Sequence, residues 1–186
     1  MKRFALTLPL ICLAACNNGP DVDMKNATPE EVAAEMRKNG GGESFVNPGK
    51  WQQTVTLLEI DAPGMPPEAR QMMQKAMDQV QQHEVCLTPE QAKSPKADFF
   101  TGKDQNCRYE HFKWGGGKID LKLDCQHPNA KQVMLLTGDY DPDSYTMTMT
   151  ADTAGGGAME KMTMKMKVDA KRIGACDGSE KLQVGN

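Results

Sequence analysis

An antiparallel hairpin is predicted by the stretch CRYEHFKWGGGKIDLKLDC, residues 107–125. In its second half, Ile119, Leu121 and Leu123 alternate strictly with charged residues, a period of two that is typical of a strand with one dry face. Three glycines at 115–117 separate the two halves, where a tight turn is expected. The stretch therefore predicts an antiparallel sheet.

The same alternation continues on both sides of this hairpin. Strands are predicted, in chain order, at residues 51–60, 83–88, 107–114, 118–125, 131–140, 145–152 and 159–169, with a last short strand at 172–176. Tight Gly or Asp-Pro turns join several of them, so strands that follow one another in the sequence should pair in the sheet. The dry face of such a sheet must be buried against another element, or the sheet must curl on itself.

Two helices are predicted before this meander. The first, at 28–38, starts with the capping box T-P-E-E but holds few apolar residues, so a spacer or surface helix is expected. The second, at 66–82, carries one apolar stripe of helical period and is expected to cover the sheet. The stripe consists of Ala69, Met72, Met73, Ala76, Met77 and Val80. The predicted fold is mainly β (α+β): a curved antiparallel β-meander or partly open barrel with one amphipathic helix packed on it.

Residues 1–16 have the pattern of a bacterial lipoprotein signal. Two basic residues precede a largely apolar run at 4–15, which is shorter than the ~20 apolar residues that span a bilayer. The run ends in L-A-A-C, which resembles the bacterial lipobox; an ordinary cleaved signal followed by a chance cysteine is the alternative. We expect Cys16 to be acylated and to hold the protein on a membrane. By resemblance to enterobacterial sorting, Asn17 favours the outer membrane.

The predicted organisation has four parts. A signal peptide at 1–15 precedes a lipidated tether and short helix at 16–46, in which residues 17–24 are expected to be tether alone. A single β-rich domain follows at 47–176, and a tail at 177–186. The chain has 22 basic and 25 acidic residues and no basic stripe, which argues against nucleic acid as a partner.

Four cysteines outside the signal suggest two disulfides in an oxidising compartment. Cys86, Cys107, Cys125 and Cys176 allow three pairings. We favour Cys86–Cys107 with Cys125–Cys176, because the first bridge closes a short loop. None of the four lies in a C-x-x-C pair, which argues against a redox or zinc role.

Several short strings resemble those of one bacterial secreted family, the one known as domain of unknown function 3617. They are P-G-K-W at 48–51, M-P-P-E at 65–68, C-L-T-P-E-Q at 86–91, C-x-Y-E at 107–110, G-G-G-K-I-D at 115–120, D-S-Y-T-M-T-M at 143–149 and R-I-G-A-C at 172–176. The likeness covers about residues 45–176 and includes the four cysteines. It implies an exported, cysteine-paired, methionine-rich envelope domain, and it implies no activity.

Methionine is the most unusual feature of the composition, with 14 residues in the chain. The alternation places Met147 and Met149 on one face of a strand, and Met162, Met164 and Met166 on one face of the next. These five thioethers should share one surface, which could face Met72, Met73 and Met77 of the predicted helix. Three interpretations are open: plain core, an adaptable pocket for an apolar ligand, or a soft-metal site for Cu(I).

The motifs of common enzymes do not occur in the sequence. H-E-x-x-H and G-x-S-x-G are absent, and His83, His111 and His127 lack metal-ligand spacing. We therefore expect a non-catalytic cell-envelope lipoprotein without a cofactor. It would bind an apolar small molecule in an open, methionine-lined cavity, or bind an envelope protein through an exposed patch or edge strand. The alternative is a periplasmic Cu(I)-binding protein that uses the methionine-rich hairpin.

Overall fold

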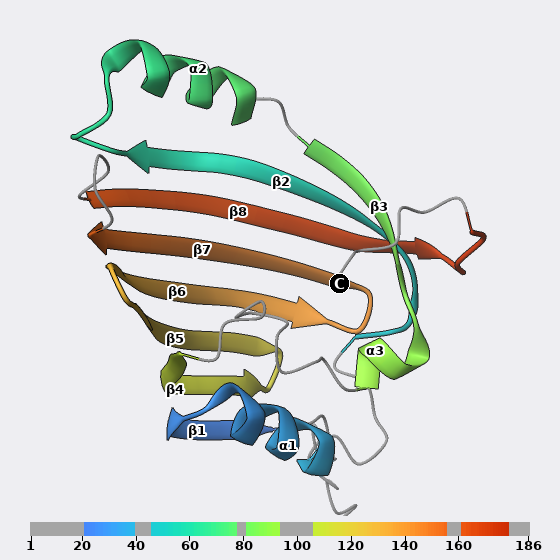
Figure 1. The fold of residues 1–186 in the computed structure, drawn as a ribbon. Helices are drawn as coiled ribbons and strands as arrows, with labels where there is room; N and C mark the ends of the chain where they lie inside the picture. The colour runs from blue at the N-terminus through green and yellow to red at the C-terminus, as the bar shows by residue number, and fades with distance from the viewer. Residues whose placement is uncertain (1–20, 40–45, 78–80, 94–105, 156–160, 179–186) are drawn as a thin grey trace, which may run out of the picture.

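The protein forms one open, eight-stranded antiparallel sheet in the computed structural model (Figure 1), which describes residues 21–39, 46–77, 81–93, 106–155 and 161–178. Its elements are β1 (Val22–Ala27), α1 (Pro29–Asn39), β2 (Gly49–Asp61), α2 (Pro67–Met77), β3 (Gln81–Leu87), α3 (Pro89–Lys93), β4 (Cys107–Gly115), β5 (Lys118–His127), β6 (Ala130–Asp141), β7 (Ser144–Gly155) and β8 (Lys161–Gly174). The predicted fold class is confirmed.

The strands from β4 to β8 pair in sequence order, as the tight turns between them predict. The sheet then continues with β2 and β3 beyond β8, and with β1 beyond β4 at the opposite edge. The β4–β5 turn uses Gly116 and Gly117 at positive φ, a backbone conformation that glycine adopts without steric cost. The order β1-β4-β5-β6-β7-β8-β2-β3 leaves β1 and β3 as the two edge strands.

The first described strand, β1, begins at Val22, so the prediction of a tether at 17–24 is wrong for Val22 to Met24. Val22 pairs with Trp114 of β4 and is buried. This strand is difficult to recognise from the sequence because its apolar residues do not alternate regularly. Asn26 has a positive φ of 52°, and this irregularity in the backbone turns Ala27 toward the dry face. A short edge strand with one wet face contains too few apolar residues to be recognised from the sequence.

Helix α1 covers the core, contrary to the prediction of a spacer or surface helix. Its predicted capping box is present: the amide of Glu31 donates to Thr28 Oγ1 at 3.2 Å, and the amide of Thr28 donates to Glu31 Oε2 at 2.7 Å. Val32, Ala33 and Met36 are buried. Because β1 pairs with β4, the helix that follows β1 lies over that edge of the sheet (Figure 1).

Helix α2 does not supply the expected cover in its described side chains. Met72 is 73% exposed and Met73 is half-buried, and Gln81 and Gln82, which lie within the range predicted for this helix, belong to β3. The side chain of Met77 lies outside the described residues. Arg70 Nη2 donates to the carbonyl of Ala62 at 2.9 Å and ties α2 to the turn after β2. That turn carries α2 beyond the edge of the sheet, beside β2 (Figure 1).

The two predicted disulfides form, but the favoured pairing is wrong: the bridges are Cys107–Cys125 and Cys86–Cys176. Cys107 and Cys125 are direct partners in the β4–β5 ladder, with Cα atoms 4.0 Å apart. Both cysteines of this hairpin lie at about the same distance in sequence from the glycine turn, so its register alone brings them together. Loop length, on which our pairing relied, is a weaker guide than strand register.

Candidate ligand-binding face

One face of the sheet carries a continuous apolar surface, which we call the methionine face. Residues that pair directly across antiparallel strands point to the same side, so the register defines its rows. From β6 through β7 and β8 to β2, the three rows are Gly138-Met147-Val168-Val55, Leu136-Met149-Met166-Leu57 and Met134-Ala151-Met164-Ile60. Every position of these rows is apolar.

Side chains on this face are fully buried at the edge under α1 and become more exposed toward β2. The middle row extends back across β5 to β4 and reads Phe112-Leu121-Leu136-Met149-Met166-Leu57. Phe112 and Leu121 are 0% exposed and Leu136 is 6% exposed, whereas the last three side chains of the row are only half-buried. Val32 and Met36 of α1 belong to the same core cluster as Phe112, Leu121 and Leu136, which explains why the first half of the row is the dry one.

Methionine is concentrated in the half-buried part of this surface. The fully buried positions of β4 and β5 hold Phe112, Ile119, Leu121 and Leu123, among others, and no methionine. By contrast, the methionines of β6, β7 and β8 are all half-buried. They are Met134, Met147, Met149, Met162, Met164 and Met166. Residue type and exposure therefore change together along one continuous face.

Two small residues shape the methionine face. A Cβ added to Gly138 would lie 2.9 Å from Met147 Cγ and 2.3 Å from the backbone oxygen of Thr146. The side chain of Met147 therefore extends over Gly138, toward β6, where it packs against the core under α1. Ala151 lies between Met134 and Met164 in the third row and is only 8% exposed, so its neighbours cover it.

Aromatic and polar groups mark one end of the methionine face. Tyr140 and Tyr145 pair directly across β6 and β7, and the ring of Tyr145 lies 5.5 Å from that of Trp51. The amide nitrogen of Gln53 donates to the Tyr145 hydroxyl at 2.5 Å. Burial raises the pKa of Tyr145 to about 12, so its hydroxyl is neutral at ordinary pH. The apolar rows thus end at neutral hydrogen-bonding groups.

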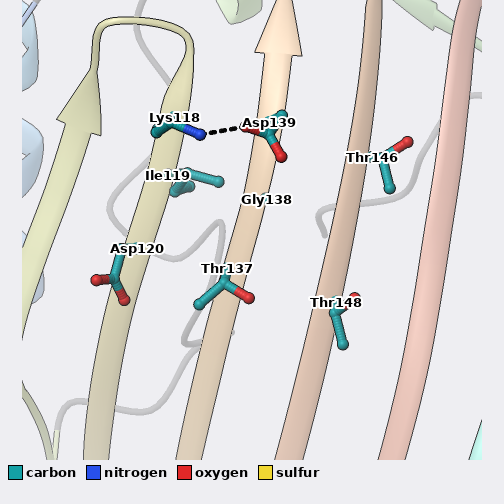
Figure 2. A pocket seen from close by; sticks show the side chains of 8 residues that line it. All are labelled: Lys118, Ile119, Asp120, Thr137, Gly138, Asp139, Thr146 and Thr148. Atoms are coloured by element: carbon teal, nitrogen blue, oxygen red, sulfur yellow. Dashed lines mark hydrogen bonds and ion pairs between the residues drawn. The ribbon is translucent and has the colours of Figure 1, made fainter.

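The opposite face is polar and carries a shallow hollow of about 380 Å³ (Figure 2). It is lined by Lys118, Ile119, Asp120, Thr137, Gly138, Asp139, Thr146 and Thr148. Lys118 Nζ lies 2.7 Å from Asp139 Oδ1, and this bond raises the pKa of Lys118 and keeps it charged. Both side chains are 76% exposed, so this pair contributes little stability. A charged lysine is a poor general base, and the hydroxyl of Thr146, which lines the hollow, donates to Asp169 Oδ1 at 2.8 Å.

The predicted site residues fall into three groups. Met147, Met149, Met162, Met164 and Met166 share one face as predicted, with Met162 paired to Thr153 one row beyond Met164. Met72 and Met73 lie on α2. Cys16 lies outside the described residues. Sequence reasoning missed Met134 and the apolar residues of β2, although the alternation within 131–140 and 51–60 carried the signal.

The described ranges lack two features, a cluster of the common metal-ligating side chains and a membrane-spanning helix. No group of three or more His, Cys, Asp or Glu side chains there could hold a metal ion. Within the same ranges, no helix is long and apolar enough to cross a membrane.

Comparisons with known proteins identify the family of this chain. Neither curated proteins nor solved structures give a significant match. A protein-family model does match the chain, over a range that includes the whole methionine face, both disulfides and all strands except β1. Residues 46–176 match the family described as "Protein of unknown function (DUF3617)", and the chain belongs to that family.

Proposed function

We propose that this protein is a non-catalytic lipoprotein of the bacterial cell envelope that binds an apolar ligand on its methionine face. The observation that carries the proposal is the position of the methionines: they occupy the half-buried part of the sheet, while Leu, Ile and Phe fill its buried part. An apolar ligand would complete the burial that α1 provides at the other end of the same face.

The composition of the face supports binding over plain packing. Met36 of α1 is buried in the core, so methionine does pack there, but within the sheet it is absent from the fully buried positions of β4 and β5. Methionine side chains are flexible and polarisable, and they are over-used on surfaces that adapt to varied apolar partners. With strands about 4.8 Å apart and same-face residues about 6.8 Å apart, the three rows span roughly 400 Å² of sheet. Patches of this size on monomers are often functional.

Attachment to a membrane would place this face near its source of ligand. We infer that Cys16 is acylated, because a basic pair, a short apolar run and L-A-A-C coincide. The chain from Cys16 to Val22 can reach about 20 Å at most. The β1 edge of the sheet would then stay close to the lipid surface, and the open rows of the methionine face lie farther along the same sheet, toward β2. Asn17 supports the outer membrane as the destination.

The anchor is tested by replacing Cys16 with alanine. The wild-type protein should be found in the membrane fraction with a mass that includes acyl chains, because several buried chains make anchoring effectively permanent. The Cys16→Ala variant should lack this mass increment and leave the membrane pellet. An unmodified wild-type mass in the membrane fraction would contradict the proposal.

Ligand binding is tested by native mass spectrometry of protein extracted gently from its own membranes. We expect a discrete lipid-sized adduct in addition to the acylated mass. Met149→Gln with Met166→Gln should abolish it, because the pair lies at the centre of the face and glutamine is polar.

A matched control lies one residue away on the same strands. Thr148 pairs with Lys167 on the opposite face, so Thr148→Gln with Lys167→Gln changes the same ladder while leaving the methionine face intact. This variant should keep the adduct. The melting temperatures of both variants should be measured, so that loss of the adduct is not caused by unfolding. Absence of any adduct from the wild type, or its equal retention in both variants, would overturn ligand binding and favour a protein partner for the face.

A further inference from the structure

The centre of the methionine face brings two thioethers directly opposite each other. Met149 of β7 and Met166 of β8 are partners in the ladder, and both side chains are half-buried. Side chains of direct partners start about 4.5–5.5 Å apart at Cβ. Two sulfur atoms on one metal ion must lie about 4 Å apart if each metal–sulfur bond is about 2.3 Å long, as in thiolate sites. The flexible methionine side chain can meet this distance without a change in the backbone.

A third thioether is available on one side of this pair. Met164 is the next residue of β8 on the same face, and its direct partner is the buried Ala151, whose side chain is a single methyl group and does not stand between Met164 and Met149. Met147 is the next residue of β7, but its side chain extends over Gly138 and packs against the core. The two neighbours of the pair are therefore not equivalent: one can turn toward it and the other is already engaged.

The chemistry of three thioethers is selective. Thioethers are soft, neutral ligands that suit Cu(I), whereas hard ions such as Mg²⁺ and Ca²⁺ require oxygen ligands. Because a thioether carries no proton to lose, such a site works over a wide pH range. Half-exposure of the three side chains gives an ion access from solvent and lowers the cost of placing a positive charge on an apolar surface.

We propose that Met149, Met164 and Met166 form a Cu(I) site on the methionine face. This site goes beyond apolar-ligand binding and does not depend on it, although the two share a surface. Occupation by the ion would join β7 to β8 at the centre of the open part of the sheet.

The test is an anaerobic titration of the purified protein with Cu(I), in competition with a chromophoric Cu(I) chelator. The wild type should take up a single ion per chain with micromolar or tighter affinity. X-ray absorption of the loaded protein should show a shell of sulfur atoms. A shell of nitrogen or oxygen atoms, as His83, His111 or His127 would supply, would overturn the proposal.

Leucine variants locate the site and separate it from the proposed function. Leucine matches methionine in volume and in apolar character but cannot bind the ion. Met149→Leu, Met164→Leu and Met166→Leu should each weaken Cu(I) binding by about tenfold or more, since even the loss of an outer-shell contact costs about 10–100-fold. These variants are assessed by Cu(I) affinity alone, so their outcome does not depend on whether an apolar ligand binds the same face.

Met147→Leu is the matched control, because it changes the same residue type on the same face at a side chain that extends away from the pair. Its Cu(I) affinity should stay at the wild-type value. Equal weakening by Met147→Leu, or unchanged affinity in all four variants, would overturn the site whatever the outcome for the apolar ligand.

Discussion

Tyr145 links the aromatic end of the methionine face to the stability of the sheet. Its hydroxyl accepts a hydrogen bond from Gln53, and its ring packs beside Trp51. Burial raises its pKa from 10.0 to about 12, because the charged phenolate is poorly solvated there. Burial also raises the pKa of Tyr109 in the core under α1. The folded state therefore holds these protons more firmly than the unfolded state does.

This difference predicts a loss of stability in alkaline solution. A group whose pKa is higher in the folded state contributes fully below its unfolded pKa, and the contribution is lost as the pH rises toward the folded pKa. For Tyr145 that window runs from about pH 10 to about pH 12. The urea midpoint should fall between pH 10 and pH 12, and Tyr145→Phe should show a shallower fall from a lower starting value. If the urea midpoint fell equally steeply with pH in both proteins, the loss of stability would not arise from Tyr145.

For single residues, the sequence predicted the face of the sheet on which a side chain lies better than it predicted how deeply that side chain is buried. Strict alternation in 145–152 and 159–169 was enough to put five thioethers on one face, and the register confirms that placement. The degree of burial could not be predicted, because it depends on which part of the face α1 reaches. The extension of Met147 over Gly138 depends equally on a cross-strand neighbour that no local pattern identifies.

The two longer helices show how local pattern and tertiary role can disagree. Helix α2 has the more regular apolar stripe, yet Met72 on it is 73% exposed. Helix α1 has fewer apolar residues, yet Met36 on it is 3% exposed. The difference arises from the strands that precede them. The end of β2 lies at an open edge, whereas β1 pairs with β4 and places α1 over the core.

A pair of truncations measures this difference. Met36→Ala should lower the free energy of unfolding by about 2–5 kcal/mol, because it leaves a cavity under α1. Met72→Ala should change it by less than about 0.5 kcal/mol, because the side chain is already in water. Urea unfolding of the two variants beside the wild type gives both values. A larger loss for Met72→Ala would show that α2, and not α1, covers the core.

The disulfides act on the whole molecule to different extents. Cys107–Cys125 spans 18 residues within one hairpin, whereas Cys86–Cys176 spans 90 and joins β3 to the segment after β8. Cross-linking a longer loop removes more conformational entropy from the unfolded chain. The long bridge therefore constrains the ends of the domain, and the short one constrains a hairpin that its turn already favours.

Removal of each bridge should reveal this order. Serine in place of Cys86 and Cys176 should cost about 4–5 kcal/mol, and serine in place of Cys107 and Cys125 about 3 kcal/mol. Denaturant unfolding measures both losses. Peptide mapping without reduction checks the connectivity directly, and a peptide that links Cys86 to Cys107 would show that our original pairing was right.

The strand order at the level of the whole sheet was only partly predictable. Tight turns predicted the run from β4 to β8, because neighbours joined by short turns must pair. The sequence offered no comparable signal for the place of β2 and β3 beyond β8, or for β1 beside β4. These pairings join distant segments, and only burial of a shared dry face selects them.

The position of β2 beside β8 has a consequence for the order in which the protein can be completed. Lys50 of β2 pairs with Gly174 of β8, and Asp61 pairs with Thr163. Because β2 precedes β8 by about a hundred residues in the sequence, it is synthesised long before its partner strand. Until β8 arrives, that side of β2 presents unpaired amides and carbonyls that could pair with another chain. A nascent chain would be most vulnerable to aggregation in this interval. The bond between Cys86 and Cys176 would mark its end, because both cysteines meet only after β8 is in place.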